Sequence, residues 1–152
     1  MKYKSLIITL LLFFYCALAQ MAQNQTLIHD LTALIKQKDN YTQQKERKIK
    51  EAIDLLRVPN ASAEQRYAIN QRLFDEFKTY IFDSAVYYVK ENIRIAEELQ
   101  KTDLQNDSRL SLASLYIISG NYLDAADLLR AIDKEQLQEP QLIQYYNCYL
   151  NL

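Results

Sequence analysis

The chain of 152 residues contains a single glycine, Gly120, and only two prolines. Turns between strands use glycine and proline heavily, so this composition argues against a strand-rich fold. Residues that favour helices, such as leucine, alanine, glutamine, lysine and glutamate, are abundant. We therefore expect an all-α protein in which Gly120 marks one tight turn between two apolar helices. Because no second glycine is available, we expect the other turns to be looser.

The first 19 residues have the features of a secretory signal peptide. Two lysines precede an apolar run at 6–19, and the last three residues of that run are Ala-Leu-Ala. The run is shorter than the roughly 20 residues that a membrane-spanning helix needs. The sequence therefore predicts cleavage after Ala19 and export to the periplasm, with an uncleaved anchor as the alternative.

Apolar residues at helical spacing divide the rest of the chain into segments. Residues 20–60 are expected to form a long N-terminal helix, which Pro59 ends. Ser62 and Gln65 have the spacing of a capping box, so a second helix should run from about Ala63 to Lys78.

Polar residues suggest where the later helices begin and end. Asp83 is predicted to cap the third helix, and Asn106 or Asp107 the fourth, after a polar connector. Pro140 fits the first turn of a sixth helix, which we expect to continue to Leu152.

The residues around Gly120 follow the spacing of a known helical repeat. Ala113 and Ala125 are small residues where two helices would cross, and Gly120 supplies a positive φ without a side-chain penalty. The run departs from the repeat only at its end, where Ile132 replaces the usual small residue and Leu137 replaces the usual proline. This run resembles a tetratricopeptide repeat, which implies an antiparallel helical hairpin. The matching residues are Leu112, Ala113, Tyr116, Gly120, Tyr122, Ala125 and Leu129.

A second, degenerate unit lies upstream, because Ala85 precedes Ala125 by 40 residues. A third unit would start at 139–152. We therefore predict that residues 61–152 form a tetratricopeptide-like α-solenoid preceded by the long N-terminal helix. An incomplete third unit leaves an apolar face open, so we expect the repeats to be truncated at the C-terminus relative to a longer protein.

A wider pattern covers almost the whole chain. Its residues lie in the first helix and in the segment around Ala85, namely Leu31, Lys38, Tyr41, Lys45, Arg47, Lys48, Ile49, Phe77, Asp83, Ser84, Ala85, Tyr88 and Ala96. The pattern is similar to the N-terminal, extracytoplasmic region of membrane-anchored regulators of Bacteroidetes, of the starch-utilisation regulator (SusR) type. This resemblance implies an exported sensing region of a transcriptional regulator and supplies no catalytic or ligand-binding residue. A free periplasmic scaffold is the alternative.

Catalytic chemistry is not indicated. His29 is the one histidine, and Cys148 is the one cysteine left after signal cleavage. One glycine cannot build a phosphate-binding loop, and no paired-cysteine zinc pattern occurs. The net charge of -1 gives no field that attracts nucleic acid, and the basic run at 45–50 fits a solvated helix face. We expect no enzyme activity, no cofactor and no metal.

Binding of a protein or peptide is the function that remains, with self-association as a second mode. Repeat solenoids bind along the face lined by the first helix of each hairpin. Candidate contacts are Tyr88, Arg109, Tyr146 and Asn147, although each tyrosine could instead pack between repeats. A membrane contact would require a helix downstream of this chain.

Overall fold

A computed structural model describes residues 31–152, which are helical with short turns and no strand. The predicted signal peptide at 1–19 and His29 lie outside the described residues. Lys45–Leu152 forms one compact unit, and residues 31–44 belong to another. Residues 31–44 are helical, and all of their side chains are exposed except that of Thr42, which is half-buried.

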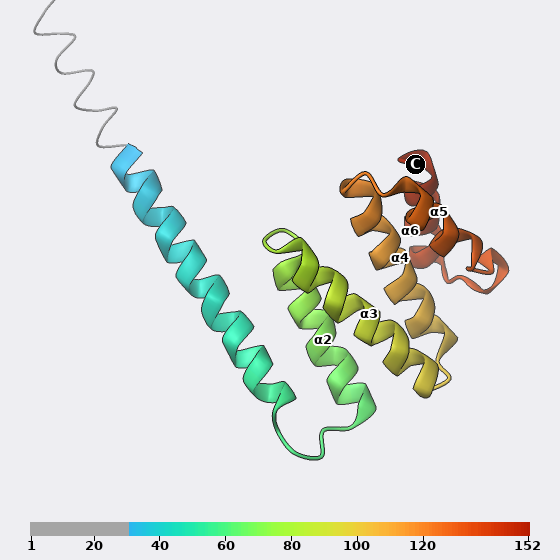
Figure 1. The fold of residues 1–152 in the computed structure, drawn as a ribbon, viewed down its shortest axis with the longest axis horizontal. Coiled ribbons are helices and arrows are strands. Elements are labelled where there is room, and N and C mark those ends of the chain that lie inside the picture. The colour runs from blue at the N-terminus through green and yellow to red at the C-terminus, as the bar shows by residue number, and fades with distance from the viewer. Residues whose placement is uncertain (1–30) are drawn as a thin grey trace, which may run out of the picture. The chain divides into compact units, whose positions relative to one another are not determined.

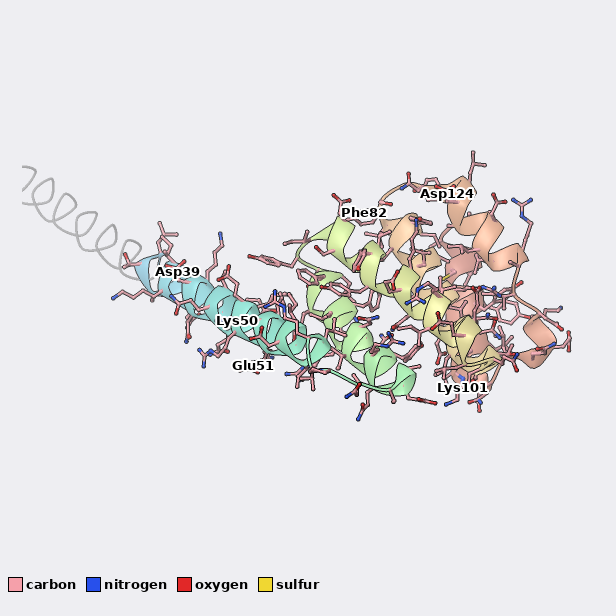
Figure 2. All side chains as sticks on the ribbon, turned by 60° about the horizontal axis from the view of Figure 1, so that its bottom comes forward. Asp39, Lys50, Glu51, Phe82, Lys101 and Asp124 are labelled. Atoms are coloured by element: carbon pink, nitrogen blue, oxygen red, sulfur yellow. The ribbon has the colours of Figure 1, made fainter. Side chains whose placement is uncertain are left out.

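The unit Lys45–Leu152 is a series of helical hairpins (Figure 1). α2 packs against α3, α3 against α4 and α4 against α5, whereas α6 packs against α4. The turns before Phe82 and Asp124 lie at one end of the stack, and the turn at Lys101 lies at the other (Figure 2). After the helical residues 45–56, the elements are α2 (Ala63–Phe77), α3 (Phe82–Glu98), α4 (Thr102–Ile118), α5 (Tyr122–Arg130), the 3-10 turn η1 (Lys134–Gln136) and α6 (Glu139–Leu150).

The predicted start of α2 is confirmed. The backbone N–H of Gln65 donates to Ser62 Oγ at 3.2 Å, and the Gln65 side chain accepts from the backbone N–H of Ser62 at 2.9 Å. Together they form the capping box, which satisfies two backbone donors that a helix start leaves without intrahelical partners. Pro140 lies in the first turn of α6, also as predicted.

Two other predicted helix starts are wrong. Asp83 lies in the first turn of α3, and the extended residue before that helix is Ile81. Almost all of the predicted polar connector, residues 101–107, belongs to α4, which begins at Thr102, so neither Asn106 nor Asp107 is a cap. Asn106 is 2 % exposed and lies inside the packed helix.

A buried hydrogen bond explains the polar residue Ser108 of α4. Ser108 is fully buried, and its Oγ lies 3.0 Å from the hydroxyl of Tyr67 on α2. The same hydroxyl donates to the carbonyl of Leu104 at 3.1 Å. A buried polar group is tolerated when it has such a partner, and the partner is 41 residues away in the sequence.

The expected continuation of α6 to Leu152 is also wrong, since α6 ends at Leu150.

Gly120 closes α4 as the sequence predicts. Its φ is +80°, and its N–H donates to the carbonyl of Ile117. The N–H of Asn121 donates to the carbonyl of Tyr116 at 2.8 Å. This pair of hydrogen bonds defines a Schellman motif, in which the residue after the helix takes a left-handed conformation.

The expectation that the other turns are looser is wrong. Gln100 closes α3 with φ +53° and donates its N–H to the carbonyl of Glu97. The N–H of Lys101 donates to the carbonyl of Ala96, so the hydrogen bonds match those around Gly120. A residue with a side chain can take this conformation at a cost of about 1–2 kcal/mol. The chain therefore builds the same tight turn without a glycine.

Alanines mark the helix crossings. Ala52, Ala85 and Ala125 are all fully buried, and they follow one another at intervals of 33 and 40 residues. Residues 45–56 therefore occupy the place of a second hairpin helix, packed on α2 and α3. In the predicted repeat signature Leu112, Ala113 and Leu129 are also buried, Tyr116 is half-buried, and Tyr122 is 49 % exposed.

Three apolar clusters hold the stack together. The first joins Ile49 and Ala52 to residues of α2, α3 and α4, and the second joins α4, α5 and α6 around Leu110 and Leu129. A third, smaller cluster joins α2 to α3 around Ile95. α4 contributes to the first two clusters, so it connects the two halves of the unit. In the part of the chain that the structure describes, no helix combines the length and apolar character needed to cross a membrane.

Candidate binding groove between α2, α4 and α6

A groove runs across the first helices of successive hairpins. One hollow of about 430 Å³ lies between α2 and α4, and a second of about 250 Å³ lies between α4 and α6. Ser114, Ile118 and Gln144 line both hollows, so we treat the two as one α2–α4–α6 groove. The other lining residues are Gln71, Phe74, Asp75, Lys78, Thr79, Ser111, Leu115, Ile117, Asn147, Cys148 and Asn151.

Repeat-equivalent positions build this groove. Ser111, Ser114 and Ile118 lie on successive turns of α4. Subtracting 40 from their numbers gives the lining residues Gln71 and Phe74 of α2 and Lys78 directly after it. Adding 33 gives the lining residues Gln144 and Asn147 of α6 and Asn151 directly after it. Residues three and four apart share one face of a helix, so each helix presents one stripe to the groove.

The groove carries no net charge from its lining. Asp75 and Lys78 are its only charged residues, and the Lys78 amine contacts the Asp75 carboxylate at 2.7 Å. The same amine lies 5.6 Å from the centre of the Phe74 ring. The other polar side chains are carboxamides, hydroxyls and one thiol. Carboxamides and hydroxyls can both donate and accept hydrogen bonds, as a peptide main chain does.

Some of these polar groups already have partners within the protein. Ser114 Oγ donates to the carbonyl of Leu110 at 2.9 Å and lies 3.3 Å from the buried thiol of Cys148. Among the described residues, the carboxamides of Gln144 and Asn147 have no hydrogen-bond partner. These two carboxamides are therefore free to bind a ligand at the α6 side of the groove.

The structure places one of the four predicted contact residues in the groove, namely Asn147. Arg109 pairs with Glu97 at 3.5 Å, which links α4 to α3. Tyr88 lies in the first apolar cluster, where its ring stacks on Phe77 with centroids 5.6 Å apart. Tyr146 is 50 % exposed and packs edge-on against Tyr145, outside the groove lining.

Sequence reasoning missed the polar residues Gln71, Ser111, Ser114 and Gln144. The 40-residue interval between the crossing alanines Ala85 and Ala125 is the sequence signal that could have located them. When the same interval is applied to the first helix of each hairpin, it pairs Gln71 with Ser111. The prediction named tyrosines because tyrosine is frequent at interfaces. However, Tyr88 packs in the first apolar cluster, and Tyr146 is not among the residues that line the groove.

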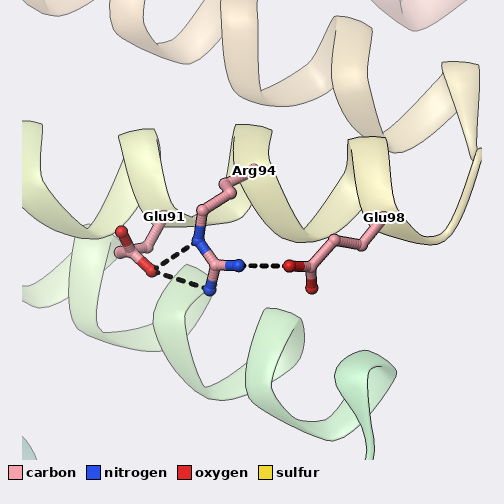
Figure 3. Close-up of polar contacts among 3 residues, drawn as sticks. All are labelled: Glu91, Arg94 and Glu98. Atoms are coloured by element: carbon pink, nitrogen blue, oxygen red, sulfur yellow. Dashed lines mark hydrogen bonds and ion pairs between the residues drawn. The ribbon is translucent and has the colours of Figure 1, made fainter.

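Among residues 31–152, two groups of titratable side chains outside the groove pair with one another. Arg94 bridges Glu91 and Glu98 along the exposed surface of α3 (Figure 3), and these hydrogen bonds raise the pKa of its guanidinium. A hydrogen bond with Tyr149, together with burial, raises the pKa of Tyr145 to about 12, so that phenol is neutral at ordinary pH. Within residues 31–152, no three histidine, cysteine or acidic side chains gather as metal ligands would.

The hairpins, the buried alanines at their crossings and the turn at Gly120 define a tetratricopeptide repeat protein. The family model of the SusR N-terminal tetratricopeptide repeat domain matches residues 35–152, and the chain belongs to that family. The resemblance expected from the sequence is thus confirmed. Domains of this repeat class are generally non-catalytic and mediate protein–protein interactions. No curated protein and no solved structure matches the chain.

Proposed function

We propose that the chain is the exported sensing region of a membrane-anchored transcriptional regulator and that it binds a peptide or protein segment in the α2–α4–α6 groove. The observation that carries the binding proposal is the alignment of repeat-equivalent polar positions along one hollow face. Membership of the SusR-type family supports the sensing role. The region has no enzymatic role in this proposal.

The groove fits a ligand that is recognised through its main chain. Peptide groups supply one donor and one acceptor per residue, and carboxamides such as those of Gln144 and Asn147 match both. Phe74 and Ile118 add apolar contact at the same face. The neutral lining does not favour a charged side chain, so selectivity should come from shape and from hydrogen bonds.

Selection from a random peptide library on the purified chain tests the binding proposal. Ser111→Phe places a large ring in the hollow between α2 and α4 and should abolish capture of the selected peptides, and Gln144→Ala should weaken it. Gln43→Ala is the matched control, because Gln43 is exposed and lies outside the groove. Equal loss of binding in Gln43→Ala and Gln144→Ala, or unchanged binding in Ser111→Phe, would contradict a site in the groove.

Export and signalling need a separate experiment. We expect a fusion of the chain to alkaline phosphatase to be active in cells, because that reporter needs the disulfides that form outside the cytoplasm. An inactive fusion would count against export. The coding sequence beyond codon 152 then separates a regulator from a free scaffold. A hydrophobic span of about 20 residues followed by heptads supports the regulator.

A further inference from the structure

A polar side chain is fully buried directly behind the groove. Asn92 of α3 is 0 % exposed and is among the largest side chains completely enclosed in the unit. Its Nδ2 donates to Oε1 of Gln71 on α2 at 3.4 Å, and its own Oδ1 has no partner among the described residues. Enclosing a carbonyl oxygen without a partner is costly, so a role other than packing is needed to explain this residue.

The repeat contains its own comparison for this position. Moving 40 residues along the chain takes Gln71 to Ser111 and Asn92 to Ile132. Ile132 follows the end of α5, is 5 % exposed and belongs to the second apolar cluster, so an apolar residue takes the repeat-equivalent sequence position. The buried residue is thus the amide Asn92 where the groove residue is the long carboxamide Gln71. It is the apolar Ile132 where the groove residue is the short hydroxyl Ser111.

We propose that Asn92 is a positioning residue that holds Gln71 by its carbonyl and aims the Nε2 hydrogens of Gln71 into the α2–α4–α6 groove. Gln71 is half-buried and lines the groove. The bond from Asn92 uses one of the two lone pairs of Oε1 and leaves both N–H donors of Gln71 unengaged. At this point the groove therefore offers N–H donors to an acceptor such as a main-chain carbonyl. This inference rests on the proposed peptide-binding function.

Fixing the carboxamide in advance favours binding. A free glutamine side chain has several rotamers, and holding it in one of them before the ligand arrives lowers the entropy lost on binding. Asn92 supplies this restraint from a site that no ligand reaches. Its effect on binding should therefore pass entirely through Gln71.

The test replaces Asn92 with leucine, which is close in shape and removes the oxygen that lacks a partner. We expect Asn92→Leu to unfold at the same or a higher urea concentration than the wild type, yet to bind more weakly by about three- to tenfold. The probe is the tightest-binding peptide selected from a random library on the wild-type chain. A purely structural Asn92 would instead give lower stability with unchanged affinity, and that result would overturn the proposal.

A double substitution shows whether Asn92 acts through Gln71. In the Gln71→Ala background, Asn92→Leu should cause no further loss of peptide affinity. If the two losses simply add, Asn92 does not act through Gln71 and the proposal fails.

An NMR measurement tests the side-chain geometry without any ligand. In the wild type, the side-chain NH₂ of Gln71 should be rigid yet should exchange rapidly with water, because it faces the groove. In Asn92→Leu, the same group should become mobile. Slow exchange of the Gln71 NH₂ in the wild type would mean that this group is the one bonded to Asn92, and the proposed orientation would be wrong. If no peptide is selected from the library, the proposed function fails, while this measurement still decides the role of Asn92.

Discussion

Gln100 and Gly120 occupy the same position at the ends of α3 and α4, with the same two hydrogen bonds around each. Their φ angles are +53° and +80°. Glycine takes such angles freely, whereas a residue with a Cβ does not. The two sites therefore form a matched pair in which one turn is relaxed and the other is strained.

We predict opposite effects of substitution at these two sites. Gln100→Gly should raise the free energy of unfolding by about 0.5–1 kcal/mol, because relief of strain exceeds the extra freedom of the unfolded chain. Gly120→Ala should lower it by about 1 kcal/mol. A Cβ at Gly120 would have no atom within 4 Å, so the loss would come from the backbone alone. Urea denaturation of both variants checks this, and a stabilising Gly120→Ala would contradict it.

The buried alanines should not tolerate larger side chains. Ala125→Leu places a larger side chain at a helix crossing where the alanine has no exposed surface, so the free energy of unfolding should fall by about 1–3 kcal/mol. Ala68→Leu, on the exposed surface of α2, is the control and should change stability by less than about 0.5 kcal/mol. Thermal and urea unfolding of the two variants measure the difference. Similar losses would show that the crossing can repack.

The buried hydroxyl of Tyr67 predicts a dependence of stability on alkaline pH. Burial raises the pKa of Tyr67 above its ordinary value of 10.0, despite the opposing hydrogen bond with Ser108. A group with a raised pKa in the folded state stabilises the fold fully below the unfolded pKa and loses that contribution as pH rises through the folded pKa. Stability should therefore decline above pH 10 as this phenol ionises in the unfolded chain.

Tyr67→Phe isolates this contribution. At neutral pH the variant should be less stable by about 1 kcal/mol, because the hydrogen bonds to Ser108 and Leu104 are lost. Above pH 10 the difference should shrink, since phenylalanine does not ionise. Free energies of unfolding at neutral pH and above pH 10 provide the comparison. A constant difference would show that Tyr67 does not titrate with unfolding.

Ligand binding in the groove should depend little on salt. Its only charges, on Asp75 and Lys78, pair with each other, so no unpaired lining charge is available to attract an ion. We expect the affinity for a selected neutral peptide to change by less than about twofold between low and physiological salt. Isothermal titration at several salt concentrations measures this. A steep loss of affinity with salt would place the contact on a charged surface instead.

Local sequence signals determined the elements of this fold. The spacing from Leu112 to Leu129 identified the repeat, because a helical hairpin needs a small residue at the crossing and a left-handed residue in the turn. Ser62 with Gln65 located a helix start, since a capping box involves only four consecutive residues. The absence of other glycines, however, did not predict loose turns, because the packed structure tolerates the strain at Gln100.

The groove and its polar supports were decided by tertiary structure. Asn106 was predicted to cap the fourth helix, yet it lies buried inside α4, where Ser108 pairs with Tyr67. Gln71 and Ser111 line the same groove only when two hairpins stack. The contact of the buried Asn92 with Gln71 likewise exists only in the packed structure. Helical periodicity records which residues share a face of one helix. Which faces then meet depends on how the hairpins pack, and that packing places the groove.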